Sequence, residues 1–141
     1  MSHLLKFEKV IPTSSQVNNL FVLLKKRTHS ISHNVLPTES EHTKFVSENP
    51  YLAWYLIHKD NKLIGSAYLQ SDNSIGLNFY EPNTQIISEA IAFIKKYHKP
   101  LSPIKSVRRE DFFVNVASDD LVLISILQNL GKTEIQRTFC A

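Results

Sequence analysis

Three apolar segments joined by tight-turn pairs constrain the fold of this chain more than any other feature. The first segment, Tyr51 to His58, is apolar on both faces. The pairs Asp60-Asn61 and Asp72-Asn73 separate it from Lys62 to Gln70 and from Ile75 to Tyr80. Because such pairs join neighbouring antiparallel strands, the sequence predicts a three-stranded meander whose first strand is buried on both faces.

Helices and further strands are predicted on both sides of this meander. Pro82-Asn83-Thr84 ends its last strand and supplies capping oxygens for a helix, and Gly131 has the position of a C-terminal cap. Hydrophobic periodicity predicts helices from Pro12-Thr13-Ser14-Ser15 to Lys25-Lys26-Arg27, over Glu39 to Glu48, over Ile86 to Tyr97 and over Leu121 to Leu130. The third of these helices is expected to have a buried stripe of Ile87, Ala90, Ile91, Ile94 and Tyr97. Further strands are predicted over Leu4 to Val10, over Asp111 to Ala117 and from Gly131 through Phe139. The order predicts an α/β (α+β) fold, a mostly antiparallel sheet with helices on both faces.

Length and composition exclude several classes of protein. With 141 residues and 43% hydrophobic residues, the chain is expected to form one domain over residues 1–141. The three glycines, Gly65, Gly76 and Gly131, cannot form a Walker loop or a GxGxxG fingerprint. No apolar run approaches the ~20 residues of a membrane span, and the first residues lack a secretory pattern, so we expect a cytoplasmic protein that does not bind membranes.

The charge pattern fits a small anionic ligand. The net charge is +3 and the pI about 9.0, and two of the three basic clusters close predicted helices, where cations favour the helix dipole. The third cluster, Lys105 with Arg108 and Arg109, lies in the loop of residues 98–110 and leaves nucleic-acid binding open as an alternative, although no recognition motif accompanies it and no nucleic acid is expected. Cys140 is the single cysteine and is interpreted as a bystander.

From about Leu4 to Phe139 the chain resembles the GNAT acetyltransferase superfamily. The order of elements matches, and three stretches carry the resemblance: Lys62 to Ala67, Ile75 to Phe93 and Asp120 to Gly131. GNAT proteins have a QxxGxG/A or RxxGxG/A sequence between the fourth strand and the third helix. This chain has QxxSxA there, in which Gln85 and Ala90 match and Ser88 replaces the first glycine.

The resemblance implies that acetyl-CoA is a co-substrate. The pantetheine is expected to pair with main chain on Leu77, Asn78 and Phe79, and the diphosphate to bind Gln85 and the amides of Ile86, Ile87, Ser88, Glu89 and Ala90, since a helix N-terminus attracts anions. Serine at position 88 either crowds the phosphates or donates its hydroxyl to them. Asp120 aligns with an asparagine that contacts the pantetheine in the family.

The catalytic groups follow the family less closely. Leu127 aligns with a tyrosine that frequently protonates the leaving thiolate, and Lys132 aligns with a phenylalanine. Leucine transfers no proton, so thiolate protonation requires water or another residue. Glu81, with Tyr80 beside it, is the candidate base for the amine, and the competing interpretation of Glu81 is a solvated charge at a strand end.

Two other groups of residues leave alternatives open. His29 and His33, with His42 and Glu39, have the spacing that begins a zinc site. The alternatives are that these are polar loop residues that bind no metal, or that the histidines contact the acceptor. Trp54 with Tyr51 and Tyr55, and likewise Tyr68, either pack in the core or line an acceptor pocket.

The sequence therefore predicts an N-acetyltransferase that uses acetyl-CoA on the amine of a small molecule, an amino sugar or another metabolite, as a monomer or homodimer. The alternative is a GNAT-fold binding or regulatory module that binds CoA poorly or not at all; Ser88, Leu127 and Lys132 favour it.

Overall fold

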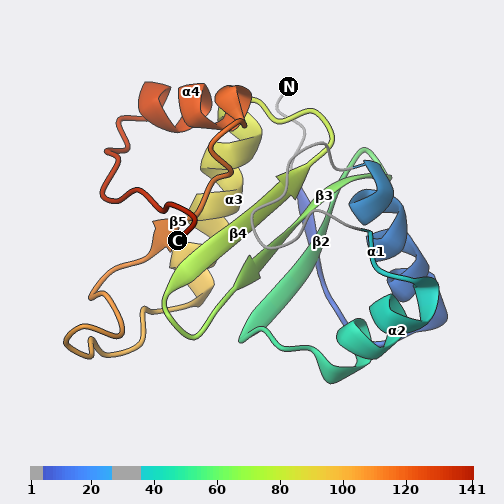
Figure 1. Cartoon of the computed structure of the whole chain (residues 1–141). Coiled ribbons are helices and arrows are strands. Elements are labelled where there is room, and N and C mark those ends of the chain that lie inside the picture. Colours follow the sequence, from blue (N-terminus) through green and yellow to red (C-terminus); the bar gives the residue numbers. More distant parts are fainter. Residues whose placement is uncertain (1–4, 27–35) are drawn as a thin grey trace.

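A single sheet runs through the part of the chain that this computed structural model describes, residues 5–26 and 36–141 (Figure 1). There its strands are β1 (Lys6–Lys9), β2 (Ala53–Lys59), β3 (Lys62–Leu69), β4 (Ser74–Phe79) and β5 (Phe113–Val114), in the spatial order β1-β2-β3-β4-β5. The first four pair antiparallel, and β5 pairs parallel with β4. The predicted meander and the mostly antiparallel sheet are confirmed.

Both predicted turns have the backbone that their residues favour. Asp60 and Asn61 have φ values of 53° and 63°, a left-handed conformation that Asp and Asn tolerate and that suits a two-residue hairpin. Asn73 has φ of 74° and is buried, and its side chain also reaches the loop of residues 98–110. Its Nδ2 donates to the carbonyls of Leu101 (3.0 Å) and Arg109 (2.8 Å), so one turn residue anchors a long connection.

Helices cover both faces of the sheet, as predicted (Figure 1). Helices α1 (Ser14–Lys26) and α2 (Glu39–Glu48) pack on one face, α3 (Thr84–Tyr97) packs on the other, and α4 (Leu121–Asn129) packs against α3. Helix α2 begins with a capping box, in which Thr38 Oγ1 accepts from Glu41 N–H (3.1 Å) and Glu41 Oε1 accepts from Thr38 N–H (3.0 Å). No helix in the described ranges is long and apolar enough to cross a membrane.

The core lies in two layers, one on each side of the sheet. Leu20, Leu23, Val46, Trp54 and Leu56 are buried between the sheet and the pair α1–α2. On the other side, α3 buries the predicted residues Ile87, Ala90, Ile91 and Ile94. Tyr97 was predicted to join this stripe, and that prediction is wrong. Its side chain is 59% exposed because it is the last residue of α3 and lies along Phe93 instead.

Two predicted strands differ in the structure. The strand Asp111 to Ala117 is reduced to Phe113–Val114, and residues 132–141 have no regular structure, so the strand predicted through Phe139 is not formed. Ile135 and Phe139, which would share one face of that strand, are 55% and 81% exposed. A strand needs a neighbouring strand, and the two-residue β5 offers almost no ladder for one.

Candidate active site

The sheet opens where β4 and β5 separate. The two strands pair only at Ser74 with Phe113 and at Ile75 with Val114, whereas β4 continues to Phe79. The outer half of β4 and residues 115–117 line a cleft of about 950 Å³. Within the described residues, no strand pairs with the outer half of β4 on the side of β5, so this edge of the sheet borders a cavity of ligand size.

Main-chain groups of alternate residues point to opposite sides of β4. The N–H of Tyr80 donates to the Ile64 carbonyl next to β3 (3.1 Å). The carbonyl of Asn73, seven residues earlier, accepts from the N–H of Phe113 on β5 (3.2 Å). Since the direction alternates along a strand, even-numbered residues of β4 face β3 and odd-numbered residues face β5.

Because of this alternation, the main-chain groups of the three residues that were predicted to pair with the pantetheine point in different directions. The main-chain groups of Leu77 and Phe79 face the unpaired edge, whereas those of Asn78 face Ser66 on β3. The side chain of Asn78 instead lies on the face of the sheet that α1 and α2 cover, where it lines the cleft with Ser66. The structure therefore provides two residues, not three, whose main chain is free to pair with an extended ligand.

Helix α3 begins close to this edge, with Asn83 as its N-cap. Asn83 Oδ1 accepts from the N–H of Ile86 (2.9 Å), and its carbonyl accepts from the N–H of Ile87 (3.1 Å). Amides from Ile87 onward donate within the helix. Among the described residues, the N–H groups of Thr84 and Gln85 have no acceptor, and both residues are exposed. These two amides form the anion-attracting end of the helix.

The residues predicted to bind the diphosphate occupy the first two turns of α3. Ile86, Ile87 and Ala90 are buried, and Ser88 is exposed. The side chain of Gln85 donates to Glu89 Oε1 (3.1 Å) and therefore lies along the helix. Because the cap at Asn83 starts the helix at Thr84, the free amides lie one turn before most of the predicted segment.

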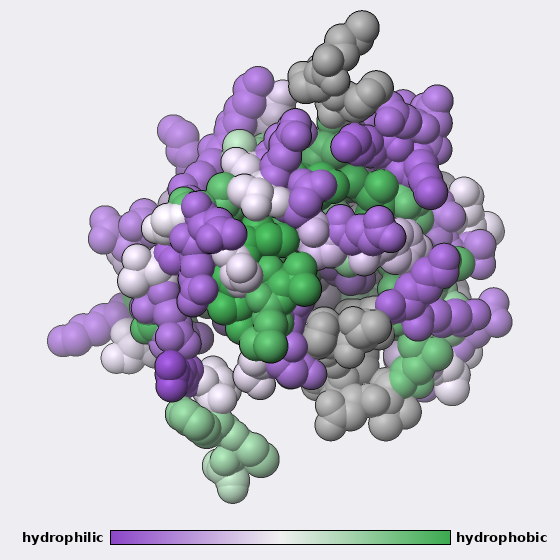
Figure 2. Space-filling model, turned by 90° about the horizontal axis from the view of Figure 1, so that it is seen from above, coloured by the Kyte–Doolittle hydropathy of each residue, from purple (hydrophilic) through white to green (hydrophobic). Residues whose placement is uncertain are grey.

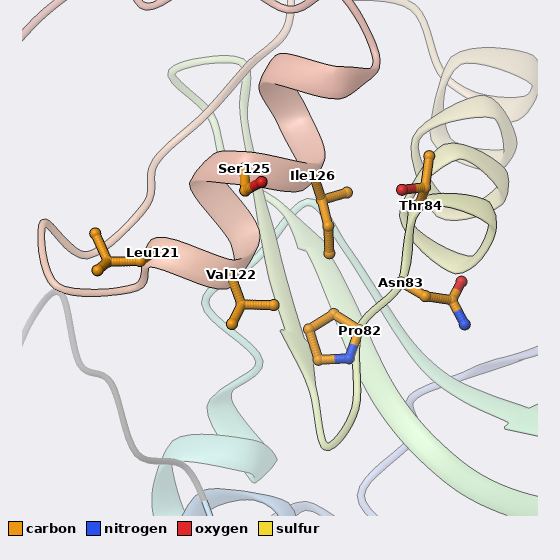
Figure 3. A pocket seen from close by; sticks show the side chains of 7 residues that line it. All are labelled: Pro82, Asn83, Thr84, Leu121, Val122, Ser125 and Ile126. Atoms are coloured by element: carbon orange, nitrogen blue, oxygen red, sulfur yellow. The ribbon is translucent and has the colours of Figure 1, made fainter.

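A smaller hollow of about 430 Å³ lies between the start of α3 and α4 (Figure 3). The side chains of Val122 and Ile126 on α4 face Pro82, which lines both hollows. Figure 2 looks down on the molecule from the side of α4 and shows apolar residues gathered near the centre of that face, with polar residues around them. Asp120 lines the larger cleft and caps α4, where its Oδ1 accepts from the N–H of Leu123 (3.2 Å).

Four aromatic side chains line the other end of the cleft: Phe45 on α2, Tyr51, Trp54 on β2 and Tyr68 on β3. The rings of Tyr51 and Tyr68 are stacked, with centroids 4.1 Å apart and planes at 16°. Trp54 meets Tyr51 edge-on at 4.9 Å, and Phe45 meets Tyr51 edge-on at 5.8 Å. Trp54 is buried and belongs to the core, and it also borders the cleft.

The alternation of a strand does not extend to Tyr51. A strand from position 51 would place Tyr51 opposite Trp54, but β2 begins at Ala53, and Tyr51 turns to the same side as Trp54. Tyr55 lies on the other face of the sheet, where its hydroxyl is 2.8 Å from His98 Nε2. Tyr55 therefore packs away from the cleft.

His42, which the sequence singled out as a member of a zinc site or a contact of the acceptor, lines the cleft. It is buried, and its Nε2 lies 3.0 Å from the Val17 carbonyl on α1, to which it donates. Burial lowers the pKa of His42, which keeps the ring neutral and leaves Nδ1 as an acceptor. Val46, which is also buried, lies four residues further along α2, and this helical spacing is the sequence signal that His42 is buried.

The other members of the zinc hypothesis are His29, His33 and Glu39. His29 and His33 lie outside the described residues, and Glu39 is exposed at the start of α2. Among the described residues, no three His, Cys, Asp or Glu side chains form a group that could hold a metal ion.

The two candidate catalytic residues at the end of β4 differ in their surroundings. Tyr80 lines the cleft, and Lys26 Nζ lies 5.1 Å from its ring centroid. Burial raises the pKa of Tyr80, so the phenol keeps its proton at neutral pH. Glu81 is exposed and lies outside the lining of both hollows. Leu127, at the aligned tyrosine position, packs between α3 and α4.

Comparison with solved structures identifies the fold. Aminoglycoside N-acetyltransferase AAC(6')-Iy, in complex with CoA, superposes with a TM-score of 0.66 at 14% identity, over 100% of this chain and 95% of that one. PseH, an N-acetyltransferase of Campylobacter jejuni in complex with acetyl coenzyme A, gives 0.62 at 15% identity over 96% and 92%. RimL, a ribosomal L7/L12 α-N-protein acetyltransferase in complex with coenzyme A, gives 0.61 at 15% identity over 91% and 79%.

No family model and no curated protein matches the sequence. The likeness to solved structures therefore lies in three dimensions, and the chain has the fold of the GNAT acetyltransferases.

Proposed function

We propose that this protein is an N-acetyltransferase that transfers an acetyl group from acetyl-CoA to the amine of a small molecule. One observation carries the proposal: the unpaired edge of β4 at Leu77 and Phe79 borders a cleft of about 950 Å³ beside the free N-terminus of α3. An extended amide chain pairs with such an edge, and a diphosphate binds at such a helix end.

The residues present fit coenzyme A. The main-chain N–H and C=O groups of Leu77 and Phe79 would hold the two amides of its pantetheine arm. The N–H groups of Thr84 and Gln85 would hold its diphosphate, and the hollow between α3 and α4 extends from that point. Ser88 is exposed on the second turn of α3, where its hydroxyl adds a donor without filling the cleft.

Acetyl-CoA supplies an activated thioester carbonyl, which an amine attacks directly. A main-chain N–H at the edge of β4 would polarise that carbonyl. Tyr80 would donate the proton that the departing thiolate requires, a role that the aligned Leu127 cannot fill. Glu81, exposed at the end of the same strand, stays our candidate acceptor for the amine proton.

Thermal unfolding with and without millimolar acetyl-CoA tests the proposal. A ligand present at one hundred times its Kd stabilises the folded state by about 2.7 kcal/mol. That corresponds to a rise in Tm of roughly 5–10 °C for a chain of this size. Absence of a rise in Tm would contradict the proposal and favour a binding or regulatory module that does not use CoA.

Variants at position 88 locate the binding site. Ser88→Phe places a ring over the first turn of α3, because side chains on a helix lean toward its N-terminus, and should abolish the rise in Tm. Ser88→Gly should preserve it. Ala92→Phe is the matched control, since it adds the same bulk at an exposed position one turn further along α3 and should leave the rise unchanged. Equal rises in all three variants would place the ligand elsewhere.

A further inference from the structure

The acceptor end of the cleft is apolar and aromatic. The stack of Tyr51 on Tyr68 is extended edge-on by Trp54 and Phe45. Phe45 is 43% exposed although it belongs to a helix that packs on the sheet, so part of this aromatic group faces open space. Leucine and proline side chains of α1, α2 and their flanking residues continue the same lining.

The contact of Tyr68 with the neighbouring strand fixes the position of its ring. Tyr68 lies directly opposite Gly76 on β4, and a Cβ at Gly76 would lie 1.9 Å from Tyr68 Cζ. The ring therefore lies flat across the glycine, next to the part of β4 where the main chain becomes free. This places the aromatic stack beside the proposed acetyl site and not on a remote surface.

Acidic side chains are scarce at this end. In the described part of the chain, Glu41 and Asp120 are the acids that line the cleft, and each already caps a helix. Lys26 adds a positive charge to the described lining. A polycation requires several carboxylates to replace its hydration, and the described lining offers only Glu41 and Asp120.

From this arrangement we infer that the acceptor is a monoamine carried on a planar apolar ring, an arylalkylamine. The inference rests on the proposed function for its reaction, in which an N–C bond forms, the C–S bond breaks, and the proton lost by the amine balances the one gained by the thiolate. The ring stacks on or beside Tyr51 and Tyr68, and the amine points to the free edge of β4. A polycationic aminoglycoside, the ligand class named for AAC(6')-Iy, would meet few carboxylates in the described lining, which favours a monoamine over it.

Binding can be measured without catalysis, because Trp54 is the only tryptophan in the chain and touches the stack. The probes are 2-phenylethylamine, ethylamine and neamine, added to the protein without acetyl-CoA. A saturable change in the fluorescence emission of Trp54 is expected with 2-phenylethylamine and not with ethylamine or neamine. The inference is overturned if 2-phenylethylamine causes no change or if ethylamine or neamine causes an equal one.

Kinetics of thiol release test the acceptor role. Burial of a phenyl ring should make kcat/KM for 2-phenylethylamine at least about tenfold higher than for ethylamine. Tyr51→Leu should reduce this ratio about tenfold, whereas Tyr51→Phe, which keeps the ring, should retain it. Tyr97→Leu, which removes an exposed tyrosine of α3 outside the cleft, should not change the ratio. Unchanged selectivity in Tyr51→Leu would overturn the inference.

The two proposals fail in different ways. If acetyl-CoA raises Tm but ring amines react no faster than ethylamine, the acetyltransferase stands and the acceptor class is wrong. If acetyl-CoA has no effect while 2-phenylethylamine still changes the emission of Trp54, the aromatic site stands and the acetyltransferase is wrong.

Discussion

At the scale of single residues, Gly76 shows how a missing side chain shapes the cleft. Its backbone is not left-handed, so glycine is not needed there for conformation. It is needed for space, because the Tyr68 ring occupies the volume that a Cβ would take. Cross-strand contact of this kind fixes the ring orientation, and through it the stack with Tyr51.

Gly76→Ala should therefore destabilise the protein by about 1–3 kcal/mol, the usual cost of overpacking, because the Tyr68 ring must move. Urea unfolding measures this cost. The control is a double-mutant cycle with Tyr68→Ala, which removes the ring before the methyl group is added. Most of the cost should disappear in that background, and an equal cost in both backgrounds would show that the ring is not the obstacle.

At the scale of elements, the sequence predicted the helices well because their signals are local. The cap Asn83 and the buried stripe of α3 both lie within one or two turns of the backbone they organise. The strand through Phe139 was mispredicted because a strand depends on a partner far away in the sequence. The spacing of Ile135 and Phe139 places both on one face of a strand, but it does not say whether a neighbouring strand exists.

The contact between α1 and α2 gives a prediction about pH. His42 on α2 donates to the Val17 carbonyl on α1, and burial lowers the pKa of His42 below its ordinary value of about 6.5. The unfolded chain then binds the proton more readily than the folded chain does. The contribution of neutral His42 to the stability of the folded state is therefore complete above about pH 6.5, and it is lost as the pH falls from that value toward the pKa of His42 in the folded chain.

Stability measured by urea unfolding should accordingly decrease between pH 7.5 and pH 5.5. His42→Gln keeps an N–H donor for the Val17 carbonyl but does not titrate, and it should show a smaller decrease over the same range. If the variant and the natural chain lose stability equally, the titration belongs to other groups.

At the scale of the whole molecule, the candidate site is made of segments that no local pattern connects. The sequence predicted the edge of β4 and the start of α3, because both lie in one continuous stretch that resembles a family motif. It left open whether Tyr51, Tyr68 and His42 line a pocket, and it did not single out Phe45, which meets Tyr51 edge-on. These residues come from α2, β2 with its preceding loop, and β3, and only the packing of α1 and α2 on the sheet brings them together.

A ligand that binds across these segments should leave a distinct pattern in amide hydrogen exchange. The amides of Leu77 and Phe79 face the cleft without a strand partner, and those of Thr84 and Gln85 lie at the free end of α3. Acetyl-CoA should slow exchange at all four. The amide of Asn78 faces β3 and is already paired in the free protein, so it should change little. NMR resolves single amides, and equal protection of positions 77, 78 and 79 would indicate general stiffening of β4, because only pairing at the strand edge distinguishes odd from even residues.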